Sequence, residues 1–170
     1  MKLRSYRKED SAVICGWIRD EESLYKWSAD RIGIFPLPAE ALNDNYAPVM
    51  DSGRFFPMTA VDEGDRVTGH LFIRYPDAAD RSTVRFGFVI VDPALRGRGF
   101  GKEMLRLAME YAVSELKASR ITLGVFVNNP SARACYEAVG FRAVGKTILC
   151  KMPVGEWECV EMELIPEPGT

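Results

Sequence analysis

Three glycines and two arginines lie within the six-residue segment 96–101 of this chain. The segment follows residues 84–91, whose apolar character predicts a strand, and leads into residues 101–117, whose pattern predicts a helix. A glycine-rich turn at the start of a helix presents backbone N–H groups, and the positive end of the helix dipole attracts anions. We therefore predict that segment 96–101 binds the phosphate of a ligand.

The spacing within this turn distinguishes three phosphate-binding patterns. A P-loop is excluded because Arg96 and Glu103 occupy positions that require glycine and serine or threonine. A dinucleotide-binding fingerprint fails because Lys102 stands where its third glycine is needed. A third pattern is arginine or glutamine, any two residues, glycine, any residue, then glycine or alanine. Arg96, Gly99 and Gly101 meet it.

A second motif lies downstream of the turn. Asn129 precedes Tyr136 by seven residues, and the pair Gly140-Phe141 follows. Together the two motifs closely resemble the acetyl-coenzyme A (acetyl-CoA) binding half of the GNAT acetyltransferase superfamily, over about residues 84–141. The resemblance implies a mixed fold of helices and strands, α/β in the broad sense and α+β in the strict one, in a single domain over residues 1–170. Its one sheet would be mixed, mostly antiparallel and split near the middle like a V, with helices on its faces.

The resemblance also assigns roles in binding the acetyl donor, acetyl-CoA. The backbone of Val89, Ile90 and Val91 would hold the pantetheine arm and the acetyl carbonyl, and Asn129 would contact the same arm. Tyr136 would lie near the sulfur. The pyrophosphate would bind along the turn, which comprises Arg96, Gly97, Arg98, Gly99, Phe100, Gly101 and Lys102.

Acetyl transfer to an amine makes chemical demands that Tyr136 and the backbone can meet. A lysine-like amine with a pKa of about 10.4 is neutral in only about one molecule in a few thousand at pH 7, so a proton must be removed from it. The leaving thiolate needs a proton, and the hydroxyl of a tyrosine is acidic enough to supply one. We expect Tyr136 to be this acid, with the N–H near Val89 facing the oxyanion.

The general base has no obvious candidate. Similar proteins place an acidic side chain on the strand before the asparagine or on the preceding strand, and this chain has Gly124 and Arg85 at those positions. A water relay, Glu21, Glu22 or His70 are the alternatives. The missing base also leaves open a catalytically silent sensor that only binds acyl-CoA. O-acetylation or a longer acyl donor would differ only in the shape of the pocket.

Length and composition restrict the class of protein. The chain has 170 residues, 47% of them apolar, which suits one domain with a substantial core. No apolar run approaches the ~20 residues that cross a bilayer, and the N-terminus lacks the apolar stretch of a signal peptide. We therefore expect a cytoplasmic protein that does not contact membranes.

The net charge and the number of metal-ligating residues indicate which ligands and partners the chain can bind. The net charge of −2 argues against nucleic-acid binding, and the single histidine and four scattered cysteines predict no metal site. The expected acceptor is the amine of a small molecule or of a peptide N-terminus. Dimers are common among similar proteins, so a homodimer is one expected assembly.

The remaining elements must hold these residues around the ligand. The first third of the chain predicts helices, the first of them with Asp10 as its N-cap and the second beginning at 20–22. Asn129 and Pro130 predict the start of another helix, which ends at Gly140. A long helix between two strands implies a parallel crossover. The predicted strands are 55–61, 66–75, 84–91, 121–127, 142–149 and 156–164.

Overall fold

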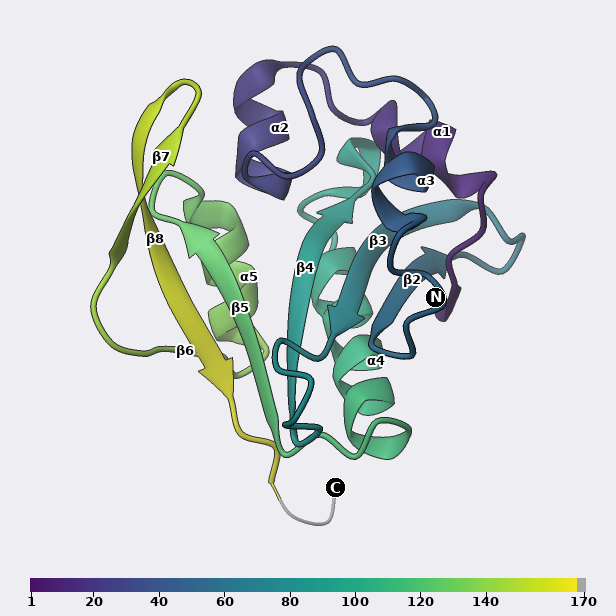
Figure 1. Cartoon of the computed structure of the whole chain (residues 1–170). Helices are drawn as coiled ribbons and strands as arrows, with labels where there is room; N and C mark the ends of the chain where they lie inside the picture. Colours follow the sequence, from purple (N-terminus) through teal and green to yellow (C-terminus); the bar gives the residue numbers. More distant parts are fainter. Residues whose placement is uncertain (168–170) are drawn as a thin grey trace.

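One eight-stranded sheet organises the chain in the computed structural model, which describes residues 1–167 (Figure 1). The strands lie in the order β1-β2-β3-β4-β5-β8-β6, and β7 also pairs with β8. The strands are β1 (Lys2–Ser5), β2 (Phe55–Val61), β3 (Val67–Arg74), β4 (Thr83–Val91), β5 (Arg120–Phe126), β6 (Arg142–Ala143), β7 (Ile148–Met152) and β8 (Gly155–Leu164). The helices are α1 (Asp10–Cys15), α2 (Glu21–Ser28), α3 (Ala41–Tyr46), the 3-10 turn η1 (Pro93–Leu95), α4 (Phe100–Ser114) and α5 (Pro130–Ala138).

The sheet splits between β4 and β5, its one parallel pair of strands. These strands pair only at their beginnings, where residues 83–85 of β4 face residues 120–122 of β5. Beyond this point β4 stays paired to β3 as far as Val91, while β5 stays paired to β8 as far as Phe126. The two strands therefore diverge, as Figure 1 shows, and the expected V-shaped split is confirmed.

A bulge in β4 accompanies the split. The register between β3 and β4 shifts between His70 and Phe72, and Phe88 on β4 has a positive φ of 50°. An extra residue on one strand of a pair bends that strand and increases its twist. The bulge thus turns the far half of β4 away from β5.

Helices cover both faces of the sheet. On one face, α4 buries the stripe Met104, Leu105, Ala108 and Ala112 against β-strand residues such as Leu123. On the opposite face, α1 to α3 enclose a second core with residues of β3, β4 and β5. Residues that alternate along a strand face opposite sides, so the odd-numbered core positions of β5 contact α4 and α5, and Gly124 faces the side of α1 to α3.

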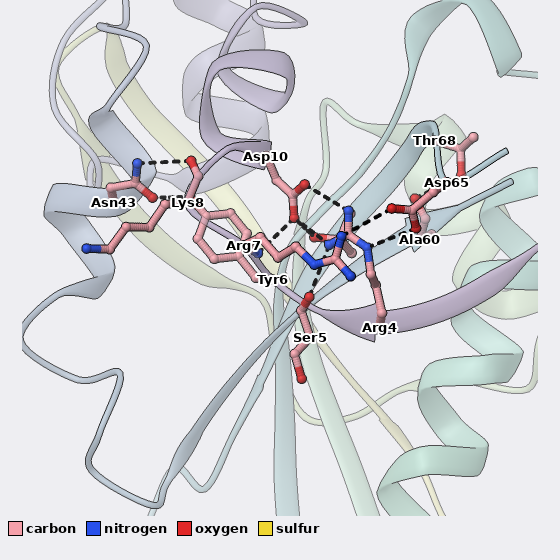
Figure 2. A network of polar contacts seen from close by, with 11 residues as sticks. Arg4, Ser5, Tyr6, Arg7, Lys8, Asp10, Asn43, Ala60, Asp65 and Thr68 are labelled. Atoms are coloured by element: carbon pink, nitrogen blue, oxygen red, sulfur yellow. Dashed lines mark hydrogen bonds and ion pairs between the residues drawn. The ribbon is translucent and has the colours of Figure 1, made fainter.

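The N-terminus differs from the prediction of helices alone, because residues 2–5 form β1 and pair with β2. Asp10 is also not an N-cap. Its carboxylate instead accepts hydrogen bonds from both terminal nitrogens of Arg4, at 2.8 and 3.0 Å, and from the hydroxyl of Thr59 at 2.8 Å. It also accepts one from the backbone N–H of Arg7 at 2.9 Å. Figure 2 shows this network, which joins β1, α1 and β2.

The C-terminal region contains three strands where two were predicted. The predicted strand 142–149 is interrupted at Gly145, whose φ is 69°, so that β6 and β7 pair separately with β8. The hairpin of β7 and β8 extends beyond the sheet and leaves Ile148 and Leu149 58% exposed. No helix within residues 1–167 combines the length and the apolar character that crossing a bilayer requires.

Candidate active site

The predicted phosphate-binding turn lies between η1 and α4. Gly97 and Gly99 have positive φ angles of 74° and 84°, which favour glycine, and Gly99 is the N-cap of α4. No other part of the described chain comes within 4 Å of where a Cβ would stand at either glycine. The first N–H groups of α4 have no acceptor within the helix. The turn therefore offers free donors at an open surface.

The described residues leave the positive charge around this turn without a carboxylate partner. Within residues 1–167, none of Arg96, Arg98 and Lys102 forms an ion pair with a carboxylate. Arg98 lies over the ring of Phe100, 5.4 Å from its centroid. An anion bound at the N-terminus of α4 would meet these cations and the helix dipole together.

The predicted pantetheine strand has a free backbone edge. Residues 86–91 of β4 lie beyond the last pair with β5. Because the N–H of Asp92 donates to Thr68 on β3, alternation directs the N–H groups of Val91 and Val89 toward the split. An extended ligand chain could therefore bond to β4 as an additional strand does.

Three of the predicted segments meet at Gly101. A Cβ at this glycine would lie 3.3 Å from the sulfur of Cys135 on α5 and 3.7 Å from a methyl carbon of Val91 on β4. The close approach accounts for glycine here and places the turn, β4 and α5 side by side. Tyr136 follows Cys135 directly in the chain.

Asn129 and Tyr136 lie at the start and in the last turn of α5. The side chain of Asn129 caps the helix by accepting from the N–H of Ala132 at 3.4 Å. The ring of Tyr136 is buried against Phe141, and burial raises the pKa of its hydroxyl, so that the group stays protonated. Within the described residues this hydroxyl has no hydrogen-bond partner, and the protein does not enclose it completely.

At the two positions expected for a base, Gly124 has no side chain and Arg85 forms an ion pair. Arg85 extends over β5 and binds both carboxylate oxygens of Glu161 on β8, the second at 3.1 Å. Glu161 is the register partner of Gly124, and a Cβ at that glycine would lie 2.9 Å from a guanidinium nitrogen of Arg85. The space of a larger residue at 124 is therefore filled by this pair. The sequence did not point to Glu161. The one available signal was Arg85, a charged residue within the otherwise apolar strand 84–91 that would need a partner.

The other candidate bases lie in unsuitable surroundings. His70 is fully buried, its Nε2 is 2.7 Å from the hydroxyl of Tyr46, and burial lowers its pKa to about 3. Glu21 and Glu22 lie on the exposed surface of α2, where Glu22 pairs with Lys26 at 2.7 Å.

A separate pocket of about 300 Å³ lies beside α3, on the flank of the molecule near β1. Tyr6, Asn43, Tyr46 and Met50 are among its lining residues, and it touches none of the residues predicted to bind the donor. The hydroxyl of Tyr6 donates to the side chain of Asn43 at 2.6 Å in its wall. The residues predicted from the motifs therefore lie away from this pocket.

Comparison with known proteins shows the family to which the chain is related. The model of the family described as "Acetyltransferase (GNAT) family" matches residues 14–141. An N-acetyltransferase 9-like protein of Nematostella vectensis is 23% identical over 141 residues, which cover 79% of this chain and 71% of that protein. The L-amino acid N-acetyltransferase AaaT of Escherichia coli is 34% identical over 88 residues, which cover 52% of this chain and 54% of that protein.

Among solved structures, the spermidine N-acetyltransferase of Vibrio cholerae in complex with CoA and spermine has a TM-score of 0.80. The match covers 96% of this chain and 94% of that one at 19% sequence identity. A match at this identity shows a shared fold, which includes the open, mostly antiparallel sheet.

Proposed function

This chain belongs to the acetyltransferase (GNAT) family, whose members use acetyl-CoA, and on that premise we propose that it transfers an acetyl group directly to a primary amine. The acceptor would be a small molecule or a peptide N-terminus that binds together with the donor. The observation that carries the proposal is the meeting of the glycine turn, the free edge of β4 and α5 around Gly101. Relatives whose names specify amino acid or polyamine N-acetylation support an amine acceptor.

The turn and β4 would bind the donor. Free N–H groups at Gly99 to Lys102 would receive the pyrophosphate, while unpaired Arg96 and Arg98 add positive charge at the rim. The N–H groups of Val89 and Val91 would bond to the pantetheine arm, and Asn129 would contact the same arm from α5. Bound acetyl-CoA supplies an activated thioester carbonyl.

Tyr136 would protonate the leaving group. As the amine nitrogen bonds to the carbonyl carbon and the C–S bond breaks, the sulfur takes the proton of the Tyr136 hydroxyl. The amine proton passes to water, and water returns a proton to the Tyr136 phenolate. The raised pKa of Tyr136 keeps that proton in place until a thiolate forms. The N–H near Val89 would bond to the developing oxyanion.

The proposal is tested by thiol release from acetyl-CoA in the presence of a panel of amines. We expect amine-dependent release, with a roughly 10²- to 10⁴-fold lower kcat in Tyr136→Phe and unchanged coenzyme A binding by calorimetry. Tyr111→Phe, at a half-buried position of α4, is the matched control and should keep full activity. Absence of release with every amine would overturn the proposed amine acetylation, and unchanged turnover in Tyr136→Phe would remove its role as acid.

A further inference from the structure

Two arginines lie side by side at the base of the split. Arg74 on β3 and Arg85 on β4 are register partners, and both side chains face the side of α1 to α3 because Ile73 and Phe86 face the other core. Like charges placed directly opposite each other on neighbouring strands destabilise a sheet. This pair therefore needs an explanation beyond packing.

The protein neutralises only one of the two. Arg85 is bound by Glu161 and also lies 3.4 Å from the hydroxyl of Thr122. Arg74 is half-buried, and its guanidinium has no hydrogen bond or ion pair with any residue in 1–167. Its pKa is lowered by burial first, and then by the nearby charges of Arg85 and Arg31.

The charges around Arg74 are unequal in number. The groups that act on it are the guanidinium groups of Arg85 and Arg31 and the carboxylate of Glu161. With Arg74 itself, three positive groups face one negative group. A half-buried guanidinium in such surroundings favours the binding of an anion, and its planar shape suits a carboxylate.

This cluster lies next to the predicted reaction centre. Arg85 pairs with Thr122 in the parallel register, and its guanidinium reaches the place beside Gly124, two residues farther along β5. The same two-residue step along β4 leads to Gly87, which immediately precedes the bulge at Phe88. The positive cluster therefore lies just below Val89, whose N–H is proposed to face the acetyl group.

We infer that Arg74 binds a carboxylate of the acceptor, with Arg85 adding positive charge beside it, and that the acceptor is an amino acid. The inference rests on the proposed acetyl transfer. In an amino acid a single carbon separates the amine from the carboxylate, so a carboxylate held by the cluster leaves the amine close to the thioester. A polyamine carries only positive charge, which Arg74, Arg85 and Arg31 repel. The product is an N-acetyl amino acid that keeps its carboxylate, and the atoms that bond and break are those of the proposed reaction.

Pairs of acceptors that differ only in the carboxylate test this inference. L-phenylalanine is compared with phenethylamine, and L-lysine with cadaverine, with spermidine as a further acceptor. We expect kcat/KM to be about 10- to 100-fold higher for each amino acid than for its partner amine, as one charged hydrogen-bonded contact implies. Equal or better use of cadaverine, phenethylamine or spermidine would overturn the inference while leaving the proposed acetyl transfer intact.

The variant Arg74→Gln separates recognition from folding. It should raise KM for the amino acids by about 10- to 100-fold, change kcat little and leave kcat/KM for the partner amines unaltered. Arg7→Gln, which removes an exposed arginine paired with Asp65, is the matched control. An equal loss for both members of each pair would make Arg74 a structural residue.

A binding measurement gives an answer that does not depend on turnover. Calorimetry with the coenzyme A-loaded protein should detect N-acetyl-L-phenylalanine but not N-acetylphenethylamine, and Arg74→Gln should abolish the difference. If no acceptor releases thiol, the proposed function fails, and this titration still decides whether Arg74 binds a carboxylate. Equal binding of both compounds by the unaltered protein would overturn the inference.

Discussion

His70 shows how burial fixes the chemistry of a single residue. The ring is fully enclosed, contacts the hydroxyl of Tyr46 and has a pKa lowered to about 3. Protonation at neutral pH would place an unpaired charge in a core shared with Phe72 and Ile90. The residue is therefore a neutral member of the core, and it is a poor general base despite its place one strand away from the split.

This environment predicts a pH-dependent stability. In the unfolded chain His70 has a pKa of about 6.5 and binds a proton below it, whereas in the folded chain it stays neutral down to about 3. The contribution of His70 to the free energy of unfolding is thus complete above pH 6.5. It declines by about 1.4 kcal/mol per pH unit as the pH falls toward 3. Between pH 6.5 and 5, the free energy of unfolding measured in urea should fall by about 2 kcal/mol more for the unaltered protein than for His70→Gln. Identical slopes for the two proteins would contradict this account.

At the scale of elements, the turn before α4 works through its backbone. Gly99 and Gly53 both have positive φ angles, of 84° and 68°, and both have open space around the Cβ position. Only Gly99 stands at the N-terminus of a long helix, where donors converge on an anion. The two glycines therefore share a conformational constraint and differ in the proposed ligand contact.

This difference allows a matched comparison of two alanine variants. Gly99→Ala and Gly53→Ala should each lower the free energy of unfolding by about 1 to 2 kcal/mol, because alanine is strained at positive φ. Only Gly99→Ala should weaken coenzyme A binding, by at least about tenfold, since a methyl group and a shifted backbone disturb the N–H donors. Calorimetric titration of both variants checks this. Equal affinities would show that the pyrophosphate binds elsewhere.

The elements that the sequence predicted well are those with local signals. The cap at Asn129 with Pro130 and the apolar stripe of α4 each lie within a few residues, and the parallel crossover follows from them. Strand β1 carries a single leucine and exists because β2 offers it a backbone edge. The division of β6 from β7 likewise depends on how β8 pairs with each of them.

The same distinction applies to the candidate site. The turn at 96–101 is a contiguous motif, so its type and spacing could be read from the chain. The pairing of Arg85 with Glu161 joins residues 76 positions apart, and the opposition of Arg74 and Arg85 depends on a bulge-shifted register. Such contacts depend on the assembled sheet, which is why the charge at the acceptor side could not be foreseen.

For the whole molecule, the split divides the sheet into two arms. Strands β1 to β4 form one arm and β5 to β8 the other, and within the described residues the strands of the two arms pair only where 83–85 face 120–122. The core under α4 and α5 continues across both arms, but the far edges of β4 and β5 have no strand between them. A ligand that bonds to β4 and contacts α5 would therefore connect parts of the molecule that the sheet leaves apart.

The resulting prediction concerns stability and local protection together. Coenzyme A at 100 times its Kd should raise the free energy of unfolding by about 2.7 kcal/mol. Hydrogen exchange should slow at residues 86–91 of β4 and in the first turn of α4, while the ladder between β2 and β3 exchanges as before. Gly99→Ala at the same ligand concentration should show a smaller gain and weaker protection of α4. A gain spread evenly over the sheet would mean that coenzyme A does not bind along the open edge of β4, because a ligand that bonds there protects that edge first.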